Sequence, residues 1–283
     1  MDQKNKRTIL QIIATAITNG YILGFFKGQI FTGKSKIVCT PGLNCYSCPG
    51  AVASCPIGAL QAVIGGRKHS FSFYVIGILL MFGVLCGRLI CGILCPFGLI
   101  QDLLYKIKTP KIKLPQQIDK PLRYIKYIIL IFPVILLPMF LTNQFGMAQP
   151  YFCQWICPVG TLEGGIPLML TNKGIRDMVG FLFNFKMFLL IVTLISSIYI
   201  YRPFCKYICP LGAFYSLFNK YSFYQMKLDK DKCIGCKKCE KQCKMNVKVT
   251  KEINSLECIR CGECKDICPQ KAISSTFKYK NTL

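Results

Sequence analysis

The sequence has few of the residues that many redox and catalytic sites require. It contains a single histidine, His69, and this excludes a bis-histidine haem or a Rieske centre, since each needs two histidine ligands. It has no C-x-x-C-H motif for haem attachment. It also has no G-x-G-x-x-G and no P-loop, the usual motifs for binding nucleotides. No nucleophile–base pair or pair of catalytic carboxylates is recognisable, so we assign no catalytic residue and expect neither a hydrolase nor a transferase.

Acidic residues are scarce as well. The 283 residues include 12 Asp and Glu against 36 Lys and Arg, a formal net charge of +24. Such a charge can indicate binding to nucleic acid or to an anionic membrane surface. However, 52% of the residues are apolar and the mean hydropathy is +0.40, which is too apolar for an ordinary soluble domain. We therefore expect the membrane as a partner, and no nucleic acid.

Four segments are long and apolar enough to form the roughly 20-residue helix that crosses a membrane. They are residues 8–26, 71–92, 124–141 and 179–200. The apolar run of the first continues past its small residues, which favours an uncleaved anchor over a signal peptide. The sequence thus predicts an all-α transmembrane bundle of about four spans.

The distribution of basic residues predicts the orientation of this bundle. Six Lys and Arg lie in residues 101–123 and seventeen follow Tyr201, whereas residues 142–178 hold two. Basic residues collect on the cytoplasmic side of multi-pass proteins. We therefore expect a multi-pass protein of the cell membrane with a cytoplasmic tail, and outward loops at 27–70 and 142–178.

The chain becomes polar and lysine-rich near Tyr221. This change divides it into a membrane domain, residues 1–220, and a second domain, residues 221–283. A domain of about 60 residues with so little apolar material needs a metal or disulfide staple to fold.

The tail contains eight cysteines in two runs of identical spacing, C-x2-C-x2-C-x3-C. They are Cys233, Cys236, Cys239 and Cys243, followed by Cys258, Cys261, Cys264 and Cys268. This spacing resembles the bacterial two-[4Fe–4S] ferredoxins, small α+β domains, and favours clusters over paired zinc sites. In that family the fourth cysteine of each run binds the other cluster. The resemblance thus implies one [4Fe–4S] cluster on Cys233, Cys236, Cys239 and Cys268, and another on Cys258, Cys261, Cys264 and Cys243.

Three C-x3-C-P motifs lie in the membrane domain, at Cys91/Cys95, Cys153/Cys157 and Cys205/Cys209. Cysteines four residues apart share one face of a helix, and the following proline ends that helix. Each motif offers two thiolates, so two motifs complete one site. The predicted topology brings the first and third motifs to the cytoplasmic face, as a candidate site of Cys91, Cys95, Cys205 and Cys209.

The segments 87–98 and 202–212 read as an internal repeat around these two motifs. With the tail, they resemble the membrane-bound polyferredoxin family, exemplified by the quinol-oxidising subunit of periplasmic nitrate reductase systems. The resemblance implies an electron-transfer subunit of an oxidoreductase complex. Its redox partners would be a quinol or a cytoplasmic flavoprotein or reductase, and an acceptor at the other membrane face. The alternative is an assembly, maturation or redox-sensing factor for a respiratory metalloenzyme.

Six further cysteines fall in the two loops expected to face outward. We predict one more membrane cluster there, on Cys45, Cys48, Cys153 and Cys157, with Cys39 and Cys55 as alternative ligands. The membrane domain would then hold one or two [4Fe–4S] clusters beyond the two of the tail. Two disulfides among these cysteines are the other interpretation. Cys86, in the middle of a predicted span, is expected to be a small buried apolar residue.

Arg88 and Arg202 each stand three residues before the first cysteine of an inner motif. They could extend their charged ends to the membrane interface. Alternatively, they could compensate the negative charge of a thiolate-bound cluster. The sequence leaves both interpretations open.

Overall fold

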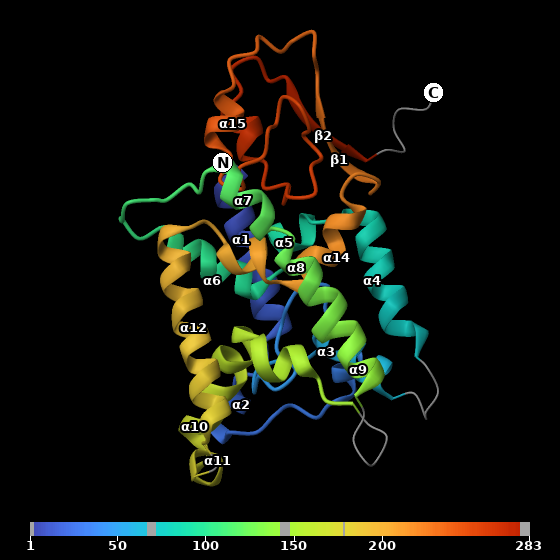
Figure 1. Cartoon of the computed structure of the whole chain (residues 1–283), viewed down its shortest axis with the longest axis vertical. Helices are drawn as coiled ribbons and strands as arrows, with labels where there is room; N and C mark the ends of the chain where they lie inside the picture. Colours follow the sequence, from blue (N-terminus) through green and yellow to red (C-terminus); the bar gives the residue numbers. More distant parts are fainter. Residues whose placement is uncertain (1–2, 67–71, 142–147, 178, 278–283) are drawn as a thin grey trace.

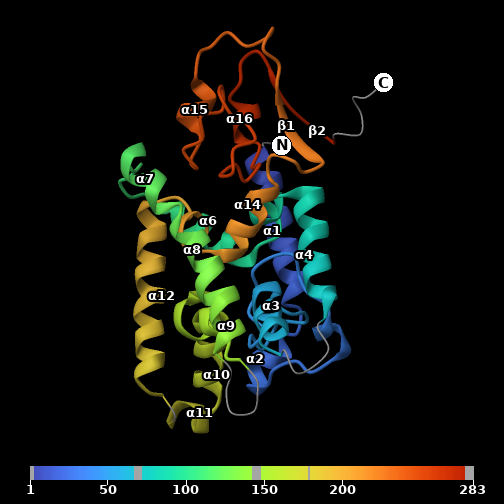
Figure 2. The same ribbon diagram turned by 45° about the vertical axis from the view of Figure 1, so that its right-hand side comes forward.

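A computed structural model describes residues 3–66, 72–141, 148–177 and 179–277; His69 and the start of the second predicted span fall outside these ranges. The described chain is mostly helical, with a small module containing a two-stranded sheet at one end of the helices (Figures 1 and 2). One hydrophobic core joins the helices and includes Phe97, Phe152 and Phe204. A second core lies in the module around Met226 and Ile259.

Two continuous helical stretches of the described chain are long and apolar enough to cross a membrane. They are Gln116–Phe140, of 25 residues, and Phe181–Tyr199 (α12), of 19 residues. The other two predicted spans contain shorter helices, α1 (Gln3–Thr18, 16 residues) and α4 (Phe73–Cys86, 14 residues). At 1.5 Å per residue these are about 24 and 21 Å long. In both views α4 and α12 flank the bundle on opposite sides (Figures 1 and 2).

Prolines shape the first of the two long stretches. It consists of α7 (Gln116–Leu122), α8 (Ile125–Ile129), the π-helix η2 (Leu130–Leu136) and α9 (Leu137–Phe140). Pro133 lies inside η2 and has no N–H to donate. The wider π-helical turn accommodates this missing bond without ending the helix.

Short helices position the cysteines of the membrane domain. Those that carry or follow them are α3 (Pro56–Gly65), α5 (Leu89–Ile93), α6 (Pro96–Tyr105), η3 (Phe152–Ile156), η4 (Gly160–Gly165), α13 (Pro203–Tyr207) and α14 (Pro210–Phe218). The remaining short helices are α2 (Leu23–Lys27), η1 (Lys34–Ile37), α10 (Ile166–Thr171) and α11 (Lys173–Asp177).

The second cysteine of each C-x3-C-P motif is not helical, in contrast to the prediction of one continuous helix face. Cys95, Cys157 and Cys209 have ψ angles of 115°, 111° and 115°, in the extended region. A residue before proline is disfavoured in the helical conformation by contact with the proline ring. The proline then starts a new helix at α6 and α14, where its missing N–H costs nothing.

The end module contains β1 (Tyr224–Leu228), α15 (Lys238–Gln242), α16 (Glu263–Asp266) and β2 (Ile273–Phe277). The two strands pair in antiparallel fashion, with Tyr224 opposite Phe277 and Leu228 opposite Ile273. This pairing joins the start of the module to its end. Both cysteine runs lie in the chain between these two strands, and their loops and short helices form the rest of the module (Figure 2).

A buried ion-pair network fixes the module to the bundle. Arg88 is 0% exposed and donates to Glu257 Oε2 at 2.7 Å and to the Leu256 carbonyl oxygen at 2.9 Å. Lys126 Nζ lies 2.5 Å from Glu257 Oε1. Burial alone would raise the pKa of Glu257, but the two cations hold it down, at about 2. One module carboxylate thus neutralises two buried cations of the bundle.

Replacing Glu257 with glutamine should weaken this interface. Glu257→Gln leaves Arg88 and Lys126 buried without a counter-charge, and we expect a loss of about 3–5 kcal/mol. Thermal unfolding and limited proteolysis of the module in detergent would measure it. Glu252→Gln is the matched control, because its pair with Lys220 is about half exposed on both sides. Equal stability of the two variants would contradict the assignment.

Candidate iron–sulfur centres

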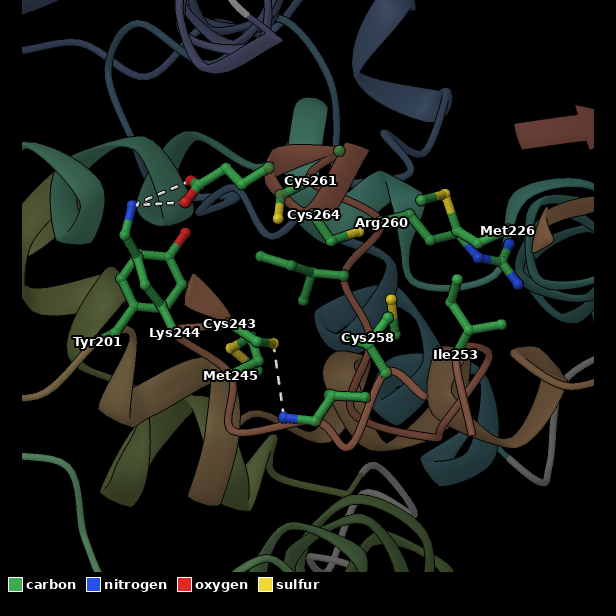
Figure 3. Close-up of a pocket in the computed structure, with 15 residues that line it drawn as sticks. Tyr201, Met226, Cys243, Lys244, Met245, Ile253, Cys258, Arg260, Cys261 and Cys264 are labelled. Carbon is green, nitrogen blue, oxygen red and sulfur yellow. Dashed lines mark hydrogen bonds and ion pairs between the residues drawn. The ribbon is translucent and has the colours of Figure 1, made fainter. Parts of the chain in front are cut away.

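Four thiols of the module surround one cavity, and they come from both cysteine runs. Cys258, Cys261 and Cys264 of the second run line it together with Cys243 of the first (Figure 3). Gly262 precedes α16 with φ 80°, a left-handed conformation that glycine adopts without strain, and so lets the loop turn tightly. The Val247 N–H points to Cys243 Sγ at 3.4 Å.

The other four thiols of the module line a second cavity. Cys233, Cys236 and Cys239 come from the first run and Cys268 from the second. Gly235, with φ 69°, provides the tight turn between the first two. These two groups of four are the sets that the ferredoxin resemblance implies, and their assignment as cluster ligands is proposed below.

Lys244 follows the last cysteine of the first run, at the position where Pro269 follows that of the second run, so the two runs depart from one pattern here. Its ammonium group forms an ion pair with Glu263 at 2.8 Å (Figure 3). Since Glu263 immediately precedes Cys264, the pair connects the end of the first run to the second. The departure from the pattern therefore adds a link between the two ligand loops.

The spacing between the thiols distinguishes a site for a single metal ion from a site for a larger cluster. Among the described residues, no group of three or more His, Cys, Asp or Glu side chains is placed to hold a single metal ion. A tetrahedral zinc site needs its sulfurs about 2.3 Å from one ion. A cubane cluster accepts one thiolate on each of four irons and fills the space between more widely spaced sulfurs. The donor sets of four thiols around a cavity fit the larger group.

The first and third C-x3-C-P motifs meet at one site, here called the inner site. Its four thiols, Cys91, Cys95, Cys205 and Cys209, are 4–6% exposed. Burial raises the pKa of the Cys209 thiol, and the nearby thiols of the other three raise it further. Two hydrogen bonds end on sulfur here, from Gln101 Nε2 to Cys205 at 3.1 Å and from the Gly212 N–H to Cys209 at 3.3 Å.

Two arginines join the motifs of the inner site in a reciprocal way. Arg88, from the first motif, donates to the carbonyl oxygen of Cys205 at 3.1 Å, and Arg202, from the third, donates to that of Cys91. Arg202 is 0% exposed and is held by Asp102 through two bonds of 2.8 and 2.6 Å. Full burial rules out extension of either side chain to the interface. Their charges lie beside the thiols, where they offset negative charge.

The inner site lies directly against the module. A carbon added at Gly92 of α5 would lie 2.5 Å from the carbonyl oxygen of Ile259, which stands between two cysteines of the second run. In addition, Arg260 donates to the carbonyl oxygen of Cys86 at 2.9 Å. Backbone contact therefore connects one ferredoxin cavity to the inner site.

The outward-loop cysteines form a second site in the bundle, here called the outer cavity. Its volume is about 480 Å³, and four of its lining residues are Cys45, Cys55, Cys153 and Cys157. Cys48 is not in this lining; its Sγ faces Asn19 Oδ1 at 3.6 Å. Cys39 pairs through its backbone with Ser54 and is also absent from the lining. All nineteen cysteines lie in the described ranges, and each is a free thiol in the structure.

Three polar residues near these sites were not identified from the sequence. Gln61 Nε2 lies 3.2 Å from Cys153 Sγ, as Gln101 Nε2 does from Cys205 Sγ at 3.1 Å. Glu163 accepts the Cys45 N–H at 2.8 Å, and burial raises the pKa of its carboxyl to about 7. The sequence feature that could have identified the two glutamines is their position, since each stands six residues after a cysteine that precedes proline.

Comparison with known families gives two matches. A family model described as a 4Fe–4S binding domain matches residues 69–115, 127–166 and 185–230, and each match contains one C-x3-C-P motif. A model described as a 4Fe–4S dicluster domain matches residues 225–275, the end module. No solved structure matches the chain.

Several curated proteins are similar over most of the chain. An uncharacterized protein of Methanocaldococcus jannaschii is 33% identical over 72% of this chain and 78% of its own length. The ferredoxin-type protein NapH of Escherichia coli is 24% identical over 80% of this chain and 75% of its own. The putative electron transport protein YccM of Escherichia coli is 27% identical over 75% of this chain and 56% of its own.

The grouping of the module thiols predicts which substitutions affect the same cluster. Cys243→Ala and Cys258→Ala belong to different runs but line one cavity, so both should abolish the same EPR signal. Cys239→Ala should abolish the other. Redox-titrated EPR with iron analysis would measure this, with Cys86→Ala as the control that retains every signal. If Cys243→Ala and Cys258→Ala abolished different EPR signals, each cluster would take its ligands from a single run.

Proposed function

The chain belongs to the polyferredoxin family of iron–sulfur electron-transport proteins, and from that premise we propose that it conducts electrons across a membrane. The donor is a cytoplasmic reductase or a quinol, and the acceptor lies at the opposite face. The observation that carries this proposal is the order of the thiol sites. Neighbouring sites adjoin: Gly92, next to Cys91, meets Ile259 of the nearer module cavity. Leu43 both contacts Cys95 Sγ through its carbonyl oxygen and lines the outer cavity.

In this proposal, two [4Fe–4S] clusters occupy the module. Cys233, Cys236, Cys239 and Cys268 would hold one, and Cys243, Cys258, Cys261 and Cys264 the other. Cys91, Cys95, Cys205 and Cys209 would hold a further cluster at the inner site. Each cluster accepts and releases one electron when bound. The protein fixes their order and supplies the buried arginines and hydrogen bonds to sulfur that set their potentials.

Exposed apolar faces support a membrane position for all four predicted spans. In α1, Ile12 and Ile17 are 52% and 69% exposed, and in α4 Phe73 is 76% exposed. In α12, Phe188 is 61% exposed, and in η2 Phe132 is 54% exposed. Contiguous apolar surface of this kind is stable against lipid and not against water. We propose four spans, with α1 and α4 continued by their neighbouring segments.

The orientation follows from the basic residues. The N-terminal end of α1 contacts the module, where the Gln3 N–H donates to Asp266 at 3.1 Å. Residues from the loops predicted to face outward meet at the other end, where Asn172 donates to the Gly28 carbonyl oxygen at 2.8 Å. The positive-inside rule then assigns the module to the cytoplasm. Electrons entering from a cytoplasmic donor would reach the inner site through the contact of α5 with the module.

Removal of an inner-site ligand should block conduction and spare the module. In sealed vesicles containing the purified protein, Cys205→Ala should abolish reduction of an enclosed acceptor by an external reductant. The EPR signals of the module should remain, because its eight cysteines are unchanged. Cys86→Ala is the control, because the Cys86 thiol lies outside the four thiol sites. Conduction at the unmodified rate in Cys205→Ala would rule out the inner site as an intermediate.

A second test addresses the contact between module and bundle. Gly92→Ala places a carbon 2.5 Å from the Ile259 carbonyl oxygen, so the two segments must separate. We expect slower reduction of the inner centre after rapid reduction of the module, with iron content unchanged. Gly77→Ala in α4 is the matched control, since the added carbon meets nothing else in the described chain within 4 Å beyond its neighbours and the backbone of its own helix. Equal rates in both variants would place the transfer route elsewhere.

A further inference from the structure

Four segments of the membrane domain share a short pattern, Cys-Pro-apolar-Gly. They begin at Cys55, Cys95, Cys157 and Cys209. In each, the cysteine is extended, with ψ between 111° and 128°. The glycines lie at the sites: a carbon added at Gly58 would be 3.9 Å from Cys153 Sγ, and one at Gly160 would be 3.7 Å from Cys45 Sγ. The bundle thus contains four copies of one structural unit.

The copies pair in the same way at both sites. At the inner site, Gln101 of the Cys95 copy donates to Cys205 Sγ and lies 3.4 Å from its own Phe97 carbonyl oxygen. In the outer cavity, Gln61 of the Cys55 copy makes the equivalent contacts, with Cys153 Sγ at 3.2 Å and the Ile57 carbonyl oxygen at 3.3 Å. The Cys55 copy therefore pairs with the Cys153 motif through the same glutamine contacts by which the Cys95 copy pairs with the Cys205 motif.

The fourth ligand differs between the two sites. At the inner site it is Cys91, four residues before Cys95, whereas the corresponding position before Cys55 is Ala51. In the outer cavity the loop before Cys55 brings Cys45 into the lining instead, and Glu163 accepts the Cys45 N–H at 2.8 Å. Cys48 and Cys39 are nearby in sequence but are not in the cavity lining.

We propose that the outer cavity is a [4Fe–4S] site held by Cys45, Cys55, Cys153 and Cys157. In this site Gln61 is a positioning residue, as Gln101 is at the inner site. The inference rests on the proposed function and specifies its terminal centre. Gln61 is 1% exposed, and its Oε1 accepts the Phe152 N–H at 3.0 Å. This bond fixes the amide, so that Nε2 faces the sulfur. A hydrogen bond to sulfur favours the reduced, more negative cluster and raises its potential.

The surroundings of this cavity also provide positive charge. Lys186 Nζ donates to the Cys153 carbonyl oxygen at 3.0 Å and lies 3.7 Å from the position of a carbon at Gly160. It occupies the place that an arginine takes beside the inner thiols. In contrast to the inner site, two of the four outer cysteines are only partly buried. The outer centre is thus open to an acceptor on one side.

Ligand identity is tested by iron analysis and EPR on the full protein purified without oxygen. Cys45→Ala and Cys55→Ala should each lose one EPR signal and about four iron atoms, with the module and inner signals retained. Cys48→Ala and Cys39→Ala, from the same loop, should lose none. Iron loss in Cys48→Ala together with full iron in Cys55→Ala would overturn the ligand set. Full iron in all four variants, or recovery of the outer thiols as two disulfides, would overturn the site.

The role of Gln61 is tested by potential, which a merely structural residue would not alter selectively. Gln61→Leu should retain its iron and shift only the outer midpoint potential to a more negative value, and Gln101→Leu should shift only the inner one. An unchanged outer potential in Gln61→Leu would overturn the positioning role. Transfer from the module to the inner centre is recorded in the same samples. Its failure would count against the proposed function, whereas intact transfer without outer iron would overturn the outer site alone.

Discussion

Charge placed beside buried thiols is the constraint on which the rest of this structure depends. A thiolate-bound cluster is negative, and the interior of a membrane protein offers little water to stabilise it. Arg88 and Arg202 would meet this need at the inner site; they come from opposite motifs, and each reaches the backbone of the other's first cysteine. They in turn require Glu257 and Asp102 as counter-charges. Because Glu257 belongs to the module, the same charges that suit the inner site also attach the ferredoxin-like part to the bundle.

The two bundle sites share a design and differ in access. The inner site is closed, with its thiols almost fully buried against the module. In the outer cavity Cys45 and Cys153 are only partly buried, and a single lysine, Lys186, takes the place of the paired arginines. A closed centre suits exchange between groups within one protein, whereas an open one suits exchange with a separate molecule. The bundle therefore has a closed site beside the module and a partly open site away from it, although both are built from copies of one unit.

How much the sequence predicts depends on how local each feature is. The module cysteines could be sorted into two sets because their spacing resembles that of a known family, whose exchange of the fourth cysteine carries over to these positions. The lining of the outer cavity could not be predicted, since it contains Cys55 and not Cys48, and the course of this loop depends on the contact of Cys45 with Glu163, 118 residues away. The arginines were equally ambiguous, because Asp102 and Glu257 lie 100 and 169 residues from them. The shorter α1 and α4 show that hydropathy finds apolar segments and not the ends of helices.

The proline that follows each of four bundle cysteines bears on the proposed electron transfer itself. It holds Cys55, Cys95, Cys157 and Cys209 in one backbone conformation, and a short helix begins immediately afterwards. If these cysteines hold clusters, a ligand fixed in this way would move little with the small expansion of a cluster that gains an electron. Its surroundings then rearrange little between the oxidised and reduced states. A low reorganisation energy of this kind would let electrons tunnel quickly over a modest driving force, so the stiffness of the four Cys-Pro dipeptides would contribute to the speed of the proposed relay.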